Sequence, residues 1–166
     1  MVQVRVVALA VDSRSLPVVL LKPILDEPGS GNILPIWIGT QEATSILIAT
    51  EGATARRPLT HDLMKSLLEA VQAVLERVDI TRIEDGTFYA EMTLQTRDGR
   101  LVLDARPSDA IALAARVDAP IWVSDDLLET AGVPDETEVP PSPGVESELD
   151  EFKRFLDEVD PEDFQG

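Results

Sequence analysis

The chain has 166 residues, of which 14 are Lys or Arg, 31 are Asp or Glu, one is His and none is Cys, so its formal net charge is -17. This length suits one domain with an appendage, and an apolar content of 44% is sufficient for a core. The lack of cysteine excludes disulfides, thiolate zinc sites and a cysteine nucleophile, and with one histidine a metal ion would be held mainly by carboxylates, which favour Mg or Mn over Zn.

The N-terminal part of the chain predicts a hairpin, a third strand and a helix. Segments 2–12 and 18–22 are rich in Val and Leu and are expected to pair, and 33–38 follows a Gly- and Pro-containing loop as the next strand. Thr40 is expected to cap the helix and Gly52 to end it in a left-handed conformation. The predicted inner face of this helix consists of Ala43, Ile46, Leu47 and Thr50.

A second helix is predicted from Thr60, with Leu59 and Met64 at the spacing of a hydrophobic staple. Its apolar stripe is expected to face the core. The stripe consists of Leu63, Met64, Leu67, Leu68, Val71, Val74 and Leu75.

Three antiparallel strands are predicted next, over 78–83, 88–97 and 101–104. Their connections contain the dipeptides Asp85-Gly86 and Asp98-Gly99, which are typical of tight hairpin turns. The chain therefore contains more strands than helices, and most of its strands are joined by hairpins.

The last elements of the predicted domain are a third helix, a short strand and a final helical turn. Ser108 or Asp109 is expected to open the helix over 111–117, and 121–123 forms the strand. Ser124 is expected to cap a helical piece that ends at Gly132. Together these elements predict an α+β domain over 1–132, with helices packed on a mostly antiparallel mixed sheet. Its two tryptophans, Trp37 and Trp122, are expected in the core.

The segment after residue 132 differs in composition, because it holds 12 acidic and 2 basic residues, a net charge of -10. Pro and Gly predict a linker over 133–144. Residues 145–166 are predicted to form an acidic amphipathic helix that docks on its own domain or on a partner subunit, the alternative being a mobile solubilising tail. The apolar stripe of this helix consists of Leu149, Phe152, Phe155, Leu156 and Val159.

No segment is long and apolar enough to predict a membrane span or an export signal. We therefore expect a cytoplasmic protein without a membrane association. The acidic balance opposes phosphate binding over most of the surface, so a nucleic-acid partner requires a local basic site.

Two segments, 56–63 and 104–114, place charged side chains at a predicted helix start. Phosphate is favoured at such a position by the helix dipole and by the free backbone N–H groups, and arginines add bidentate donors. We expect the two helix starts to converge on one cleft. The predicted phosphate-binding residues are Arg56, Arg57, Arg106 and Ser108.

The catalytic candidates of these segments each have a structural alternative. His61 would act as a general base, or its ring would pack on the strands, and Asp62 would take part in catalysis or stabilise the first helical turn. Asp104 and Asp109 would hold a divalent ion such as Mg or Mn, with Arg106 stabilising the phosphoryl charge. In the alternative, Arg106 clamps a carboxylate at the turn and Asp109 caps the helix.

Four blocks, 34–39, 56–63, 86–90 and 104–114, resemble the bifunctional nuclease (BFN) domain family and occur in family order. The resemblance covers about residues 1–132, and segments 151–156 and 161–164 are similar to the tail of bacterial members. It implies an α+β domain that tends to dimerise and that cleaves both RNA and DNA.

Two function hypotheses follow. The first is a nuclease that hydrolyses phosphodiester bonds of RNA and DNA with low sequence preference, since base-reading features are missing. The second is a non-catalytic dimeric regulatory or assembly module that presents its acidic tail to a basic protein partner. A homodimer is expected in either case, because sheet edges and the apolar stripe of the tail must be buried.

Overall fold

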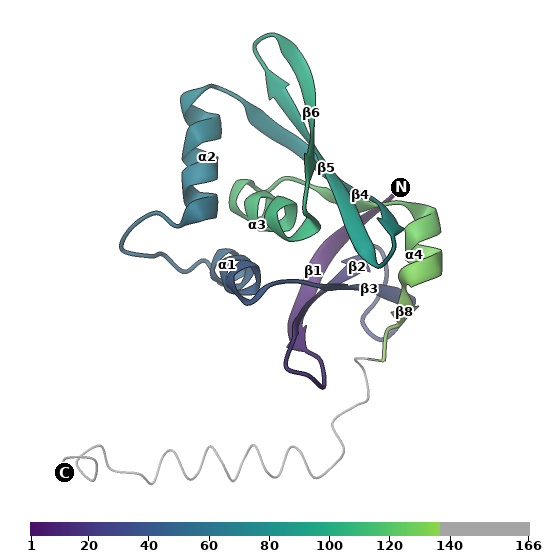
Figure 1. Cartoon of the computed structure of the whole chain (residues 1–166). Coiled ribbons are helices and arrows are strands. Elements are labelled where there is room, and N and C mark those ends of the chain that lie inside the picture. Colours follow the sequence, from purple (N-terminus) through teal and green to yellow (C-terminus); the bar gives the residue numbers. More distant parts are fainter. Residues whose placement is uncertain (137–166) are drawn as a thin grey trace, which may run out of the picture.

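The computed structural model describes residues 1–136, which form an eight-stranded sheet with four helices (Figure 1). The predicted α+β class is therefore confirmed. The strand order is β6-β5-β4-β7-β1-β2-β3-β8, and every neighbouring pair is antiparallel except β4 and β7. The predicted tail helix at 145–166 and most of the predicted linker lie outside the described residues.

The strands are β1 (Val2–Val11), β2 (Pro17–Pro23), β3 (Asn32–Trp37), β4 (Val74–Glu84), β5 (Thr87–Thr96), β6 (Gly99–Ala105), β7 (Ile121–Val123) and β8 (Val133–Pro134). The helices are α1 (Thr40–Thr50), α2 (Thr60–Ala70), α3 (Pro107–Val117) and α4 (Asp125–Ala131). None of these helices is long and apolar enough to span a bilayer.

The sheet consists of two antiparallel halves that are joined by one short strand. The predicted β1–β2 hairpin and the β4–β5–β6 meander both form, and β7 lies between β1 and β4. Asp85 and Gly86 connect β4 to β5 with φ angles of 49° and 77°. Two positive φ values in succession are typical of the tight turns that match the twist of a hairpin.

Helices α1, α2 and α3 form a layer on one face of the sheet, with α3 in the middle (Figure 1). Seven residues of α3 are buried, which explains its small and apolar composition. The buried core contributed by the helices and the sheet includes Leu21, Leu34, Ile46, Val78, Ile80, Ile111 and Leu113.

Each of these three helices begins earlier than predicted. Gly39, Leu59 and Arg106 are the N-cap residues, and none of them caps its helix with a side chain. The proline after Arg106 opens α3, because its fixed φ suits the first helical position and its missing N–H is not needed there. Residues Thr40 and Thr60 are therefore helical and do not act as caps.

The apolar stripe predicted for α2 is only partly buried. The helix ends at Ala70, and Gln72 then turns the chain with a φ of 57°, so three of the predicted stripe positions lie outside α2: Val71 directly follows the helix, and Val74 and Leu75 belong to β4. Leu63 and Leu67 are 54% and 55% exposed, and Leu47 of α1 is exposed as well. Since α2 packs mainly against α3, only a narrow face of it is covered.

The two tryptophans are less buried than expected. Trp37 is 52% exposed because it is the last residue of β3, where the chain leaves the sheet. Trp122 is half-buried, and the guanidinium of Arg77 lies 4.9 Å from the centre of its ring. Neither tryptophan therefore belongs to the core of the domain.

The domain also extends beyond the predicted boundary at residue 132. Val133 and Pro134 pair with β3, and the carboxylate of Asp135 forms a buried ion pair with Lys22 of β2. The same carboxylate accepts a hydrogen bond of 3.0 Å from the backbone N–H of Gly29. A buried lysine needs a counter-charge, so this part of the predicted linker completes the core.

The buried guanidinium of Arg116 connects all three helices of the layer. It donates to Asp62 Oδ1 of α2 at 2.7 Å, to the carbonyl of Ser45 in α1 at 3.2 Å and to the carbonyl of Ala112 in α3 at 2.8 Å. Asp62 also accepts from the backbone N–H of Leu59 at 2.8 Å. The relative positions of the helix starts therefore depend on this side chain.

Replacing Asp135 by Asn is expected to lower the free energy of unfolding by about 3–5 kcal/mol, because Lys22 loses its counter-charge in a buried position. Chemical denaturation of the full chain measures this loss. Glu136→Gln is the matched control, since Glu136 is exposed. The double change Lys22→Met/Asp135→Leu should recover part of the loss, and an unaltered stability of Asp135→Asn would contradict the role of the pair.

The pKa of Asp62 is lowered from 3.8, first by the hydrogen bond from Arg116 and then by that from Leu59. Because its pKa is lower in the folded state, the carboxylate stabilises the fold above about pH 4, and this contribution is lost as the pH falls through the folded-state pKa. Asp62→Asn should therefore cost about 1–2 kcal/mol at pH 7, with allowance for solvent exposure.

Denaturation of both proteins between pH 7 and pH 2 tests this expectation, because the two stability curves should converge in acid. Asp126→Asn, in the exposed first turn of α4, is the control. A difference that is constant with pH would rule out the charge of Asp62 as the cause.

Candidate functional site

The first turns of α1, α2 and α3 meet at a cleft of about 690 Å³. The cleft is lined by Thr40, Gln41, Glu42, Thr44, Ser45, Pro58, Leu59, Thr60, His61, Arg106 and Asp109. The positive ends of three helix dipoles therefore point to one place, and their first-turn N–H groups receive no N-cap side chain. The predicted convergence of the starts of α2 and α3 is confirmed, and the start of α1 joins them.

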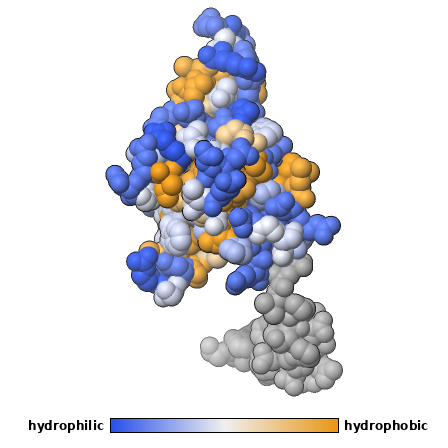
Figure 2. Space-filling model, turned by 90° about the vertical axis from the view of Figure 1, so that its right-hand side faces the viewer, coloured by the Kyte–Doolittle hydropathy of each residue, from blue (hydrophilic) through white to orange (hydrophobic). Residues whose placement is uncertain are grey.

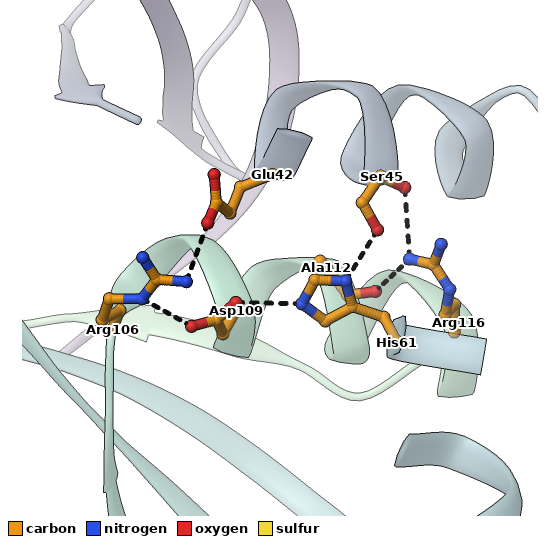
Figure 3. A network of polar contacts seen from close by, with 7 residues as sticks. All are labelled: Glu42, Ser45, His61, Arg106, Asp109, Ala112 and Arg116. Atoms are coloured by element: carbon orange, nitrogen blue, oxygen red, sulfur yellow. Dashed lines mark hydrogen bonds and ion pairs between the residues drawn. The ribbon is translucent and has the colours of Figure 1, made fainter. Parts of the chain in front are cut away.

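A chain of hydrogen bonds crosses the cleft from Ser45 through His61 to Asp109 (Figure 3). Ser45 Oγ lies 2.8 Å from His61 Nδ1, and His61 Nε2 lies 3.0 Å from Asp109 Oδ1. Each residue comes from a different helix, α1, α2 and α3 in that order. The imidazole thus contacts a hydroxyl on one side and a carboxylate on the other.

These partners define the tautomer of the neutral imidazole. A carboxylate only accepts, so Nε2 carries the proton and donates to Asp109, and Nδ1 accepts from the hydroxyl of Ser45. His61 and Ser45 are 6% and 7% exposed. The basic nitrogen of His61 is therefore directed at a hydroxyl that lines the cleft.

Asp109 remains ionised in this environment. Burial raises the pKa of its carboxyl, but the hydrogen bonds from Arg106 and His61 outweigh that effect, and the pKa is lowered from its usual value. Asp109 Oδ2 accepts from Arg106 Nε at 2.7 Å while Oδ1 faces the imidazole. An ionised carboxylate therefore accepts the hydrogen bond that orients His61.

Arg106 bridges two carboxylates at the edge of the cleft, those of Asp109 and Glu42 (Figure 3). Its Nη2 lies 2.8 Å from Glu42 Oε1, and the two carboxylates raise its pKa. Within residues 1–136, Nη1 has no partner, and most of the side chain is exposed. Gly39 makes room for this contact, since a Cβ there would collide with Glu42.

The other predicted site residues lie elsewhere. Asp104 is exposed on β6 and does not line the cleft, and Asp62 binds Arg116 beneath it. Ser108 is buried and lines a neighbouring hollow. Arg56 and Arg57 are exposed in the segment that leads to the cleft residue Pro58.

The donor set does not fit a preformed site for Mg or Mn. Both oxygens of Asp109 are engaged by His61 and Arg106, and Asp104 does not share the cleft. Within residues 1–136, no three carboxylate or imidazole side chains are arranged to hold a metal ion. The metal-binding roles of Asp104 and Asp109 stay a prediction.

Ser45 and Glu42 are site residues that the sequence did not reveal. Both lie in α1, outside the two charged segments, and they reach the cleft only because α1 packs on α3. Ser45 lies within a helix, where a serine commonly bonds a backbone carbonyl or faces solvent, so no local pattern singles it out.

Comparison with known proteins identifies relatives of the whole chain and of its domain. The profile of the family described as "Bifunctional nuclease domain" matches residues 23–136, so the match includes β8 and Asp135 and begins later than the predicted span. Over its length the chain is similar to an uncharacterized protein of Mycobacterium tuberculosis strain H37Rv, with 41% identity over 168 residues, covering 99% of this chain and 98% of that protein.

Two plant proteins are similar over the domain alone. The "Bifunctional nuclease" of Oryza minuta is 27% identical over 132 residues, which are 78% of this chain and 40% of that protein. "Bifunctional nuclease 1" of Arabidopsis thaliana is 26% identical over 120 residues, or 70% of this chain and 36% of that protein. This chain thus spans less than half the length of these plant relatives. On the extent of the profile match, the chain belongs to the bifunctional nuclease domain family.

Proposed function

We propose that this protein is a cytoplasmic nuclease that hydrolyses phosphodiester bonds of RNA and DNA with low sequence preference. The observation that carries the proposal is the Ser45–His61–Asp109 chain at a cleft where three helix starts converge. A proton acceptor and a place for a phosphate are thereby close together. The plant relatives are named bifunctional nucleases, which supports the same class of reaction.

The phosphate would lie against the first turns of the three helices. Backbone N–H groups and helix dipoles favour a non-bridging phosphate oxygen there, and Nη1 of Arg106 adds a charged donor. Arg56 and Arg57 contribute positive potential from the neighbouring segment. All these groups recognise the backbone of a nucleic acid, which accounts for low sequence preference.

Proton transfer would run through Ser45 to His61. The attacking water passes a proton to Ser45 Oγ as the hydroxyl proton of Ser45 moves to His61 Nδ1, and the ionised Asp109 stabilises the imidazolium. The water oxygen forms a bond to phosphorus, and the bond from phosphorus to the leaving oxygen breaks. The proton held by His61 then returns to the leaving oxygen, so the protein regains its starting state.

Substitutions in the cleft should strongly reduce the rate at which the purified protein cleaves labelled RNA and single-stranded DNA. His61→Asn and Ser45→Ala are expected to reduce the rate by about 10²–10⁴-fold, because proton transfer is lost. Arg106→Ala should reduce it by about 10²–10³-fold through loss of charge stabilisation. Ser66→Ala and Arg100→Ala are matched controls, since Ser66 is exposed on α2 and Arg100 pairs with Glu76 on the far hairpin.

The same cleavage assay in the presence of Mg, of Mn or of a chelator tests whether the activity requires a divalent metal ion. If Asp104 and Asp109 hold an ion, activity should be lost in chelator and in Asp104→Asn alone. Activity that survives Asp104→Asn/Asp109→Asn would indicate a contaminant or another site. No cleavage under any condition would favour the non-catalytic regulatory or assembly module, for which the acidic segment 145–166 is the proposed contact with a basic protein partner.

We also propose a homodimer, on the basis of uncovered apolar surface. Strand β6 is exposed on both faces and forms one edge of the sheet. In Figure 2, hydrophobic surface lies below the hydrophilic tip of the β5–β6 hairpin at the top of the molecule. The exposed apolar residues on β6, on α2 and directly after α2 include Leu63, Leu67, Val71, Leu101, Val102 and Leu103. An edge of this kind is a template for pairing with a second copy.

Light scattering at micromolar concentration is expected to give the mass of a dimer. Val102→Lys on the β6 edge should shift the protein to a monomer, because pairing would bury the new charge. Leu25→Lys, at a position that is 91% exposed and away from β6, should leave the dimer intact. A monomeric wild-type chain would contradict the proposal.

A further inference from the structure

The exposed indole of Trp37 is held in a fixed orientation at the end of β3. Its Nε1 donates a hydrogen bond of 3.1 Å to Asp12 Oδ2. The other oxygen of Asp12 accepts from the backbone N–H groups of Arg14 and Leu16, at 2.8 and 2.9 Å. The turn between β1 and β2 thereby anchors a tryptophan that is half in solvent. An exposed aromatic ring that is fixed in advance loses little entropy when it binds a partner.

Trp37 borders a hollow of about 380 Å³ next to the candidate cleft. The hollow is mostly apolar, and it is lined by Leu16, Ile36, Trp37, Ile38, Gly39, Gly86, Thr87, Phe88, Arg106, Pro107 and Ser108. Arg106 lines both the hollow and the cleft, so the two lie next to each other at its side chain. The hollow thus combines an aromatic ring, on which a base can stack, with a guanidinium that can bind a phosphate.

We propose that this hollow binds one unpaired nucleobase of a single-stranded nucleic acid, with the base against Trp37 and its phosphate at Arg106. The proposal rests on the proposed nuclease function and names its substrate class. A base in a duplex is covered by its neighbours, so only a single strand or an unpaired end offers a free face to the indole. Stacking on a ring is tolerant of sequence, which agrees with a site that recognises the backbone.

The positive charge of Arg106 favours a nucleotide over an apolar peptide as the ligand of the hollow. The side chains that face the hollow include one charged group, Arg106, whose Nη1 has no partner within residues 1–136. A peptide side chain would leave that donor unused. A nucleotide satisfies it with a phosphate oxygen while its base covers the apolar wall.

The fluorescence of Trp37 tests this placement directly. In the Trp122→Phe variant Trp37 is the only tryptophan, so its emission reports on the hollow alone. A short single-stranded DNA with phosphorothioate linkages, which resists cleavage, should quench this emission on binding. The same strand without bases and a duplex of the same sequence are the comparison probes, and both should leave the emission nearly unchanged.

The affinities for these probes, measured by fluorescence anisotropy of a labelled strand, distinguish the contribution of the Trp37 ring to binding from that of the Arg106 charge. Trp37→Leu should weaken binding of the single strand about ten-fold, and Trp37→Phe should retain most of the affinity, because a ring remains. Neither change should affect the strand without bases, whereas Arg106→Ala should weaken both probes. Leu25→Ala, at an exposed position outside the hollow, is the control.

Several outcomes would overturn the inference. Binding of the single strand without quenching, an unchanged affinity of Trp37→Leu, or equal affinity for the duplex would each exclude a nucleobase in the hollow. If nucleic acid is cleaved and Trp37→Leu has no effect, the nuclease proposal stands and this subsite is wrong. Quenching by the single strand with no cleavage in any metal would establish the subsite and reject the nuclease.

Discussion

The candidate site depends on one buried guanidinium. Arg116 is 6% exposed, and it joins a backbone carbonyl of α1, a backbone carbonyl of α3 and a carboxylate of α2. The carbonyl in α1 belongs to Ser45, whose hydroxyl contacts His61 on the next helix. Arginine suits this position because its planar guanidinium directs several donors in a fixed fork, which the compact ammonium of a lysine does not. Arg116 lies outside the cleft, but it helps to fix the distances between Ser45, His61 and Asp109, because it holds together the three helices that carry them.

The site also balances charge within a strongly acidic chain. Arg106 faces two carboxylates, so the resting cleft carries little net positive charge of its own, and helix dipoles supply much of its attraction for an anion. With a net charge of -17, the rest of the surface repels a polyanion. A substrate would thus be held by a few contacts near the cleft. Added salt would weaken those contacts and also screen the general repulsion.

The elements that local patterns specify are the ones that could be predicted from the sequence. The hairpin turn at Asp85 and Gly86, the left-handed Gly52 with a φ of 64° and the Ser124 cap on Leu127 each depend on residues close in sequence. Packing between distant segments could not be predicted in this way. The stripe of α2 looks like a buried face, but the domain offers it no cover, and Trp37 resembles a core residue although its strand ends there.

For the site, sequence reasoning located the two charged helix starts but not their third partner. His61, Arg106 and Asp109 belong to the recognised segments, and they do meet. Ser45 and Glu42 are ordinary polar residues of an intervening helix, and only tertiary packing brings them into the cleft. Asp104 has the chemistry of a ligand, but it lies exposed on β6 and does not line the cleft.

The strand β7 has a consequence for the order in which the chain folds. Within residues 1–136, its three residues are the only strand in the sheet that joins the half containing β1, β2 and β3 to the half containing β4, β5 and β6. During synthesis both antiparallel halves emerge before residue 121, and each has a local hairpin with which to begin. The two halves cannot join into one sheet until β7 has left the ribosome, because β7 pairs with β1 on one side and with β4 on the other. The pairing of β7 with β1 also requires the chain to close a loop of more than 100 residues, which is entropically costly. Until then the edges of β1 and β4 that pair with β7 in the finished sheet are unpaired and exposed, so a chaperone or a neighbouring nascent chain could bind them.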